Sequence, residues 1–293
     1  MLQTIEAAAA QLDAAGVSFG HGTTNAFDEA AWLVLWQLKL PLHEFDLHQN
    51  RVLTTAESTS VATLLGARIE TRKPAAYLTN EAWLQGVPFY VDERVIVPRS
   101  LIAELLADAD GNGTLDYWLR PETQNVLDLC TGNGSLAVLA ALNFPEVRVQ
   151  AADISHDALA VAAINIAKHA LQNRIELTHS DGLAQCKGVR GMPYDLILCN
   201  PPYVSSGSMA TLPAEYKAEP NISLAGGADG MDFIGPMLRA LPSVMGEHAV
   251  LVLEIGNERE HFERAFPRNE AIWLDTSAGA DQVLLLQRNS LIA

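Results

Sequence analysis

The feature of this sequence that most constrains its fold is a regular alternation of short apolar runs and helical patterns after Pro121. Strand-like runs are expected at 126–130, 147–153, 174–178, 194–200, 249–255, 271–274 and 282–286, and helices at 135–143, 156–171 and 231–241. Strands that alternate with helices form mostly parallel sheets, because each helix returns the chain to the same sheet edge. The last two runs are expected to pair as an antiparallel hairpin. We therefore predict an α/β fold with a seven-stranded, mostly parallel sheet and helices on both faces.

The chain before this alternation has a different pattern. Apolar side chains recur at helical spacing near the N-terminus, with Asp28 and the pair Thr54 and Glu57 as expected helix caps. A stretch rich in aromatic and β-branched residues follows and indicates a β-hairpin, after which Ser100 is expected to cap a helix. We predict three parts: a helical domain (1–75), a hairpin linker (76–98) and the α/β domain (99–293).

The apolar run 194–200 stops abruptly at the sequence Asn200-Pro201-Pro202-Tyr203. Proline has no N–H and a fixed φ, so strand pairing cannot continue through two prolines and the chain must leave the sheet. A side-chain amide, proline carbonyls and an aromatic ring are thereby held on a rigid loop at the end of a buried strand. We predict that this loop forms part of an active site.

A glycine-containing loop joins the expected strand 126–130 to the helix 135–143. Glycines let the backbone approach a ligand closely, and the helix N-terminus presents free N–H groups. Asp128 lies near the end of the expected strand 126–130, Asp153 ends the next strand and Asp181 follows the third. All three acids are therefore expected at the same end of the sheet as Asn200, where ligands of open α/β sheets bind. The loop predicts a cofactor site, and Gly132-x-Gly134-x-x-Ala137 also fits the dinucleotide fingerprint.

The charge of the chain restricts its partners. It has 19 Lys and Arg against 35 Asp and Glu, a formal net charge of −16. Binding along a phosphate backbone depends on Lys and Arg, so a basic or neutral partner is expected instead of a nucleic acid. The apolar runs are too short to span a membrane, and the first residues lack the basic start of a signal peptide. We predict a cytoplasmic protein.

No metal site is expected. The three cysteines, Cys130, Cys186 and Cys199, do not have the spacing of metal ligands. Residues 108–116 imitate a calcium loop through its ninth position, but the twelfth position is Leu119, where a bidentate Glu is required. We interpret this segment as a polar loop.

The ordered motifs together resemble a known family. The set Asp128-x-x-x-Gly132-x-Gly134, Asp153, Asp181 and Asn200-Pro201-Pro202-Tyr203 resembles the class I S-adenosylmethionine-dependent methyltransferases that methylate planar amino or amide nitrogens. Within that group, the chain is similar to the protein glutamine methyltransferases over nearly its whole length. Segments 212–216, 219–220 and 226–230 also resemble that family, whereas Cys130 replaces the usual first glycine of its loop.

Two branches of that family compete. The linker from Tyr77 to Ser100 resembles the branch that acts on the third protein of the large ribosomal subunit. The branch that acts on peptide-chain release factors is expected to carry a second proline and an acid after the arginine that corresponds to Arg99. We therefore expect a basic ribosomal protein as substrate, recognised by the helical domain, with a release factor as the alternative.

The resemblance implies S-adenosylmethionine as cofactor and assigns roles to individual residues. Cofactor binding is assigned to Asp128, Cys130, Thr131, Gly132, Gly134, Asp153, Ile154, Asp181, Gly182 and Asn200. Catalysis is assigned to Asn200, Pro201, Pro202 and Tyr203, and substrate contact to Asn200, Pro201, Tyr203 and Arg99. Arg99 fits a pairing with an acid even better than a substrate contact.

Three other functions stay open on the sequence alone. A nucleic-acid methyltransferase acting on exocyclic amines uses the same signature, although the acidic charge disfavours it. A nicotinamide oxidoreductase is permitted by the glycine loop, but no residue stands out as a hydride-transfer acid. A non-catalytic assembly factor is the third, with the acidic surface binding a ribosomal protein.

Overall fold

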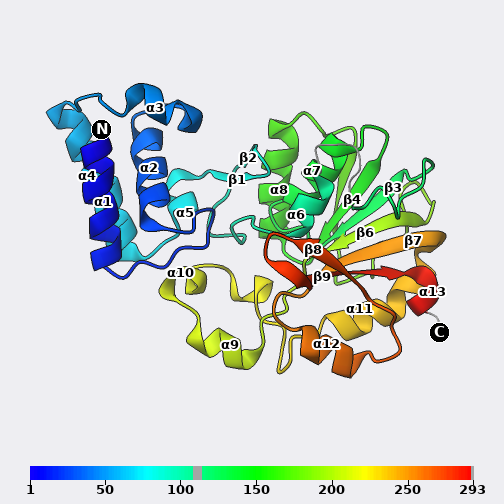
Figure 1. Cartoon of the computed structure of the whole chain (residues 1–293). Coiled ribbons are helices and arrows are strands. Elements are labelled where there is room, and N and C mark those ends of the chain that lie inside the picture. Colours follow the sequence, from blue (N-terminus) through cyan, green and yellow to red (C-terminus); the bar gives the residue numbers. More distant parts are fainter. Residues whose placement is uncertain (108–113, 292–293) are drawn as a thin grey trace.

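The computed structural model describes residues 1–107 and 114–291, which form two lobes (Figure 1). A helical lobe at the N-terminus lies beside a larger lobe built on a seven-stranded sheet, and a two-stranded hairpin lies between them. The calcium-like segment falls largely outside the described residues. Among the described helices, none combines the length and the apolar character needed to cross a membrane.

The N-terminal lobe is a small bundle of helices. They are α1 (Leu2–Ala14), α2 (Ala26–Gln37), η1 (Leu42–Glu44), α3 (Phe45–His48), α4 (Thr55–Thr71) and α5 (Ala75–Thr79). Helix α4 begins with the predicted capping box, in which Thr54 and Glu57 each accept the other's backbone N–H through a side-chain oxygen. The predicted cap of α2 is wrong. Asn25 caps it by accepting the N–H of Asp28 at 2.9 Å, because Asp28 already lies in the first turn.

The hairpin linker is shorter than the aromatic stretch that predicted it. Its strands are β1 (Ala82–Leu84) and β2 (Val87–Phe89), whereas Tyr77 belongs to α5. Helix α6 (Ile102–Leu106) follows, and Leu101 occupies its N-cap position, one residue after the predicted cap. Ser100 Oγ still accepts the N–H of Ile102, at 3.3 Å. The same hydroxyl donates to Glu254 at 2.6 Å, a partner that lies 154 residues away and that local sequence cannot reveal.

The main sheet confirms the predicted α/β architecture. Its strands are β3 (Asn125–Leu129), β4 (Arg148–Asp153), β5 (Ile175–His179), β6 (Tyr194–Cys199), β7 (Met245–Glu254), β8 (Ile272–Thr276) and β9 (Gly279–Gln287). Their order is β5-β4-β3-β6-β7-β9-β8, with the first five parallel and β9 antiparallel to both of its neighbours. The predicted edge hairpin is therefore confirmed as β8 and β9.

Helices cover both faces of this sheet (Figure 1). One face packs against α6, α7 (Ser135–Asn143) and α8 (His156–Lys168), and the other against α11 (Ile234–Ala240) and α12 (Arg259–Ala265). Strand β7 shows the alternation clearly, since Val250 and Val252 belong to the first core and Leu251 and Leu253 to the second. Burial on both faces explains why the central strands are continuous apolar runs.

The segment between β6 and α11 was predicted as a long loop but contains short helices. They are α9 (Ser206–Thr211), α10 (Ala214–Lys217) and η2 (Asn221–Ser223); two further short elements near the C-terminus are η3 (Leu241–Ser243) and α13 (Arg288–Leu291). Elements of three to six residues are too short to show a helical repeat of apolar residues. The segment lies beneath the N-terminal lobe, with α10 closest to it (Figure 1).

Candidate active site

The order of the strands reverses at β3, which has β4 on one side and β6 on the other. Ligands of open α/β sheets bind in the crevice at such a reversal, beyond the carboxyl ends of the strands. Leu129 in β3 pairs with Cys199 in β6, so the next residues, Cys130 and Asn200, leave the sheet side by side. Strand register thus brings the two predicted motifs together.

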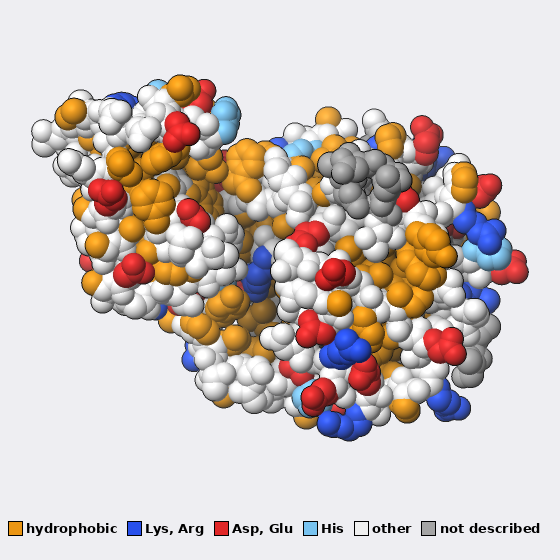
Figure 2. All heavy atoms as spheres, viewed as in Figure 1, with side chains coloured by type: hydrophobic (Ala, Val, Ile, Leu, Met, Phe, Trp, Pro, Cys, Tyr) orange, Lys and Arg blue, Asp and Glu red, His pale blue; other side chains and the backbone are white. Residues whose placement is uncertain are grey.

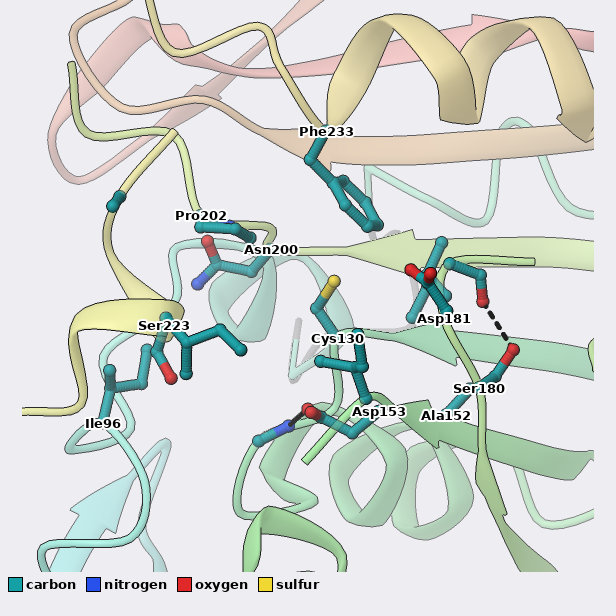
Figure 3. A pocket seen from close by; sticks show the side chains of 16 residues that line it. Ile96, Cys130, Ala152, Asp153, Ser180, Asp181, Asn200, Pro202, Ser223 and Phe233 are labelled. Atoms are coloured by element: carbon teal, nitrogen blue, oxygen red, sulfur yellow. Dashed lines mark hydrogen bonds between the residues drawn. The ribbon is translucent and has the colours of Figure 1, made fainter. Parts of the chain in front are cut away.

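A cavity of about 260 Å³, here called cavity A, lies at this edge (Figure 3). The predicted cofactor residues that line it are Cys130, Gly132, Asp153, Ile154, Asp181, Gly182 and Asn200. Figure 3 shows Asn200 with Pro202 at one end, Asp181 at the other, and Phe233 opposite Asp153. The apolar wall residues Ile96, Ile222 and Phe233 were not predicted, because they come from three separate segments without a shared motif.

The loop after β3 is held in a left-handed conformation. Cys130, Gly132 and Gly134 have φ values of 62°, 55° and 80°. A Cβ on Gly132 would meet no atom within 4 Å, so its bare backbone borders open space, whereas one on Gly134 would lie 3.1 Å from the Cβ of Ala162 in α8. Gly134 therefore permits close packing of α7 on α8, and Gly132 leaves room for a ligand.

Asp128 was expected beside Asp153, Asp181 and Asn200, but it lies behind this loop and does not line cavity A. Its Oδ2 accepts hydrogen bonds from the Thr131 hydroxyl and from the N–H of Ala137. The carboxyl group is buried, and burial raises the pKa of Asp128 to about 7. Thr131 lines a small neighbouring cavity instead, together with Asn133, whose Nδ2 is buried without a partner among the described residues.

Asp153 connects β4 to the glycine loop. Its Oδ2 accepts the N–H of Gly132 and its Oδ1 that of Ser155, both at 2.9 Å. Burial raises the pKa of the Asp153 carboxyl group, while these hydrogen bonds oppose the shift. Each carboxylate oxygen keeps acceptor capacity toward cavity A, because a carboxylate offers about four lone-pair sites.

A second cavity, cavity B, has a volume of about 270 Å³ and lies on the other side of Asn200. Its wall includes Pro201, Tyr203 and Arg99, so the predicted substrate residues do lie together. Asn200, Ser223 and Ile96 line both cavities, and Asn200 carries the side-chain amide among them. The two cavities therefore meet at one amide.

Tyr203 is fixed firmly in the wall of cavity B. Its hydroxyl donates to Glu254 Oε1 at 3.2 Å, and a Cβ on Gly256 would lie 2.6 Å from its ring. Burial, followed by the neighbouring Glu254 charge, raises the pKa of Tyr203, so its hydroxyl stays protonated and acts as a donor. Gly256 thus leaves room for the Tyr203 ring, since a side chain at position 256 would collide with it.

Arg99 is paired with an acid, as its sequence context favoured. Its guanidinium binds both carboxylate oxygens of Glu219, at 2.6 and 2.7 Å, while it also lines cavity B. The N–H of Val97 donates to the same carboxylate at 2.9 Å. Burial alone would raise the pKa of Glu219, but the nearby His21 ring and the Arg99 guanidinium lower it to about 2.

Glu215 makes the corresponding contact with the N-terminal lobe. This fully buried carboxylate pairs with Arg72 at 2.7 Å and Arg68 at 3.3 Å, and it accepts the N–H of Ser18. We call Glu215, Glu219 and their partners the lobe junction. Both glutamates were visible in the sequence as part of the segment after the prolines, but nothing local to them indicated which cations they would meet.

The described residues contain no cluster of three His, Cys, Asp or Glu side chains that could bind a metal. A hydrogen bond with the Cys199 thiol, followed by burial, raises the pKa of Cys130 well above its ordinary value, so the thiol stays protonated.

Comparisons with known proteins agree with this geometry. The methyltransferase small domain family matches residues 112–215. A ribosomal protein uL3 glutamine methyltransferase of Bordetella pertussis is 48% identical over 289 residues, which cover 98% of this chain and 94% of the relative. The proteins of the same name from Burkholderia pseudomallei and Neisseria meningitidis serogroup A are 49% and 43% identical, covering 98% and 97% of this chain and 94% and 92% of the relatives.

These similarities extend through both lobes, because they cover nearly the whole chain. They confirm the class I methyltransferase fold and the family resemblance, including the ribosomal-protein branch. This chain therefore belongs to the family of the ribosomal protein uL3 glutamine methyltransferases.

Proposed function

We propose that this protein transfers a methyl group from S-adenosylmethionine to the side-chain amide nitrogen of a glutamine in ribosomal protein uL3. The observation that carries the proposal is the position of Asn200 on the wall common to cavities A and B. A group that passes directly between two ligands requires that they meet at one point. The names of the relatives indicate the reaction and the substrate.

The wall of cavity A fits the methyl donor. Asp153 offers carboxylate oxygens to ribose hydroxyls, as the acid after the second strand does in related folds. Phe233 and Ile222 offer apolar surface to a planar base, and Gly132 lets the ligand approach the backbone. Cys130, Ile154, Asp181 and Gly182 would complete this site, while Asp128, Thr131 and Gly134 would act by shaping its loop.

Cavity B would receive the glutamine side chain. Its amide nitrogen is a poor nucleophile, because the lone pair is delocalised into the carbonyl group. The Asn200 side-chain oxygen and the Pro201 carbonyl would accept its two N–H bonds and turn the nitrogen toward cavity A. Tyr203 would pack over the planar amide, and Pro202 keeps the loop rigid.

S-adenosylmethionine supplies an electrophilic methyl carbon bonded to a sulfonium. A bond from the nitrogen to that carbon would replace the carbon–sulfur bond, and positive charge would develop on the nitrogen. The Asn200 side-chain oxygen and the Pro201 carbonyl would stabilise this charge as acceptors held in place by the protein. A proton then leaves the methylated nitrogen for solvent, since an amide oxygen and a peptide carbonyl are weak bases.

Mass spectrometry tests the proposal most directly. The purified enzyme is incubated with labelled S-adenosylmethionine and either full-length uL3 or a peptide-chain release factor. We expect one methyl group on one glutamine of uL3. A label on the release factor alone would assign the chain to the other substrate, and tight NAD binding without any response to S-adenosylmethionine in calorimetry would refute methyl transfer.

A further inference from the structure

The N-terminal lobe carries a groove that the reaction itself does not use. It has a volume of about 340 Å³ and lies between α2 and the hairpin. We call it the aromatic groove, and its large apolar wall residues are Phe27, Trp32, Leu35, Leu42, Phe45 and Trp83. Phe27, Leu42 and Trp83 are 39%, 40% and 42% exposed, so several large apolar side chains face solvent together. Such concentrated exposure is typical of a binding surface.

The groove is organised before any partner arrives. The rings of Phe27 and Phe45 meet edge to face, with centroids 6.3 Å apart. The Trp83 indole is held by a hydrogen bond from its Nε1 to Glu81 at 2.8 Å. Rigid aromatic side chains lose little conformational entropy on binding, which favours their use as anchor sites.

Charge indicates the kind of partner. In residues 1–75, Arg51, Arg68, Arg72 and Lys73 each pair with a carboxylate, so Lys39 is the one Lys or Arg outside an ion pair. The exposed acids of this lobe are Glu6, Asp13, Asp28, Asp46 and Glu70, and Asp28 also lines the groove. Figure 2 shows acidic side chains spread over this lobe and few basic ones. A basic partner is therefore favoured.

The groove is also connected to the active site. Gly22 lines the groove, and the preceding residue, His21, packs its ring against that of Tyr216 with centroids 4.3 Å apart. Tyr216 in turn lines cavity B together with Asn200. A protein whose glutamine enters cavity B would thus have another part of its surface close to the groove.

We propose that the aromatic groove is a docking site for uL3, which inserts a bulky apolar or aromatic side chain flanked by Lys or Arg. This inference rests on the proposed function. A protein that lies on ribosomal RNA neutralises phosphates with Lys and Arg, and this gives it the charge that the acidic lobe attracts. The apolar side chain of uL3 in the groove supplies affinity, and the exposed acids of the N-terminal lobe attract and orient its basic surface.

Calorimetric titration of the full-length enzyme with full-length uL3 tests the groove. Trp83→Ala and Phe27→Ala are each expected to raise the dissociation constant at least about tenfold, as for aromatic anchors of other interfaces. Leu47→Ala is the matched control, because Leu47 is 78% exposed on the same lobe but does not line the groove. Asp28→Lys is expected to raise the dissociation constant several-fold more than Glu6→Lys, an exposed charge reversal on α1.

The outcomes separate this inference from the proposed function. Equal dissociation constants for the wild type, Trp83→Ala and Phe27→Ala would overturn the proposed docking site but would not affect the proposal of glutamine methylation. Equal losses in Leu47→Ala and Trp83→Ala would also overturn it, as would a dimer of the enzyme that Trp83→Ala dissociates. A wild-type enzyme that neither binds nor methylates uL3 would overturn both proposals.

Discussion

The edge of the sheet and the lobe junction hold functional groups in place by different means. At the edge, Asp153 ends β4 while Cys130 and Asn200 follow the neighbouring strands, and the backbone ladder fixes where all three emerge. At the junction, Glu215 and Glu219 are placed by ion pairs with arginines that lie more than a hundred residues away in the sequence. Many backbone hydrogen bonds hold the residues at the sheet edge, whereas two buried carboxylates hold the lobe junction.

This difference predicts what a substitution in each region changes, catalysis or stability. A side chain at the sheet edge can be removed without loss of the strands, so its removal should affect chemistry more than folding. A carboxylate at the junction leaves buried cations without a partner, and an unpaired buried charge is expensive. Substitutions at four positions test this contrast, taken from the largest expected effect to the smallest.

Glu215→Gln tests the lobe junction. Removing this charge leaves Arg68, which is 1% exposed, with Glu29 as its remaining carboxylate partner. We expect the free energy of unfolding to fall by about 3 kcal/mol, measured by chemical denaturation. Glu260→Gln, at an exposed site in α12, is the control and should stay within about 0.5 kcal/mol of the wild type. Similar values for the two variants would contradict the role of the junction.

Asn200→Ala tests the sheet edge. We expect kcat to fall at least about a hundredfold, because one oriented acceptor is lost from the reacting nitrogen. Binding of S-adenosylmethionine, measured by calorimetry, and the free energy of unfolding should both be kept. Asn221→Ala, at an exposed position in η2, serves as the control. Unchanged turnover of Asn200→Ala would remove this residue from the mechanism.

Asp128→Asn tests the buried carboxyl group behind the glycine loop, through the pH dependence of the free energy of unfolding. The pKa of Asp128 is raised to about 7, so the folded state keeps a proton that the unfolded state loses near its ordinary pKa of 3.8. Stability contributed by this group is therefore lost as pH rises, by about 2 kcal/mol between pH 5 and pH 7. Asp128→Asn should lack this decline when unfolding is measured at both values.

The pKa of Glu219 is shifted in the opposite direction to that of Asp128, so the two groups affect stability in different pH ranges. Its folded pKa of about 2 lies below its ordinary value of 4.5, so its contribution to stability is present above pH 4.5 and is lost toward pH 2. Its ionisation therefore adds no slope between pH 5 and pH 7. Parallel pH profiles of the wild type and Asp128→Asn would show that Asp128 does not titrate in this range.

The pair Cys130→Gly and Cys130→Ala tests the smallest effect. Cys130 has a φ of 62°, a conformation that glycine adopts freely and other residues adopt at a cost of about 1 kcal/mol. Both variants lose the thiol, so their difference isolates the backbone. We expect the free energy of unfolding of the glycine variant to be roughly 0.5–1 kcal/mol higher than that of the alanine variant. A more stable alanine variant would contradict this.

The sequence predicted features whose causes are local. Helix α7 was predicted with the bounds observed, because a glycine loop precedes it and its residues form an unbroken helical run. The ends of the central strands were predicted within a residue or two, since Asp153, Asn200 and the glycine loop after Leu129 interrupt apolar runs. Strand β7 begins at Met245, earlier than predicted, because its polar start continues the strand without the apolar pattern.

By itself, then, the sequence determined the order of strands and helices and the two motifs at one edge of the sheet, because apolar periodicity and proline act within a few residues. It also determined the family resemblance, through motifs that can be read in order along the chain. Tertiary structure alone decided that Arg99 meets Glu219, that Asp128 lies behind its loop, and that Trp83 and Phe27 share a groove. Those contacts join residues tens to more than a hundred positions apart, or depend on how a side chain turns, and packing rather than local pattern selects among the possible partners.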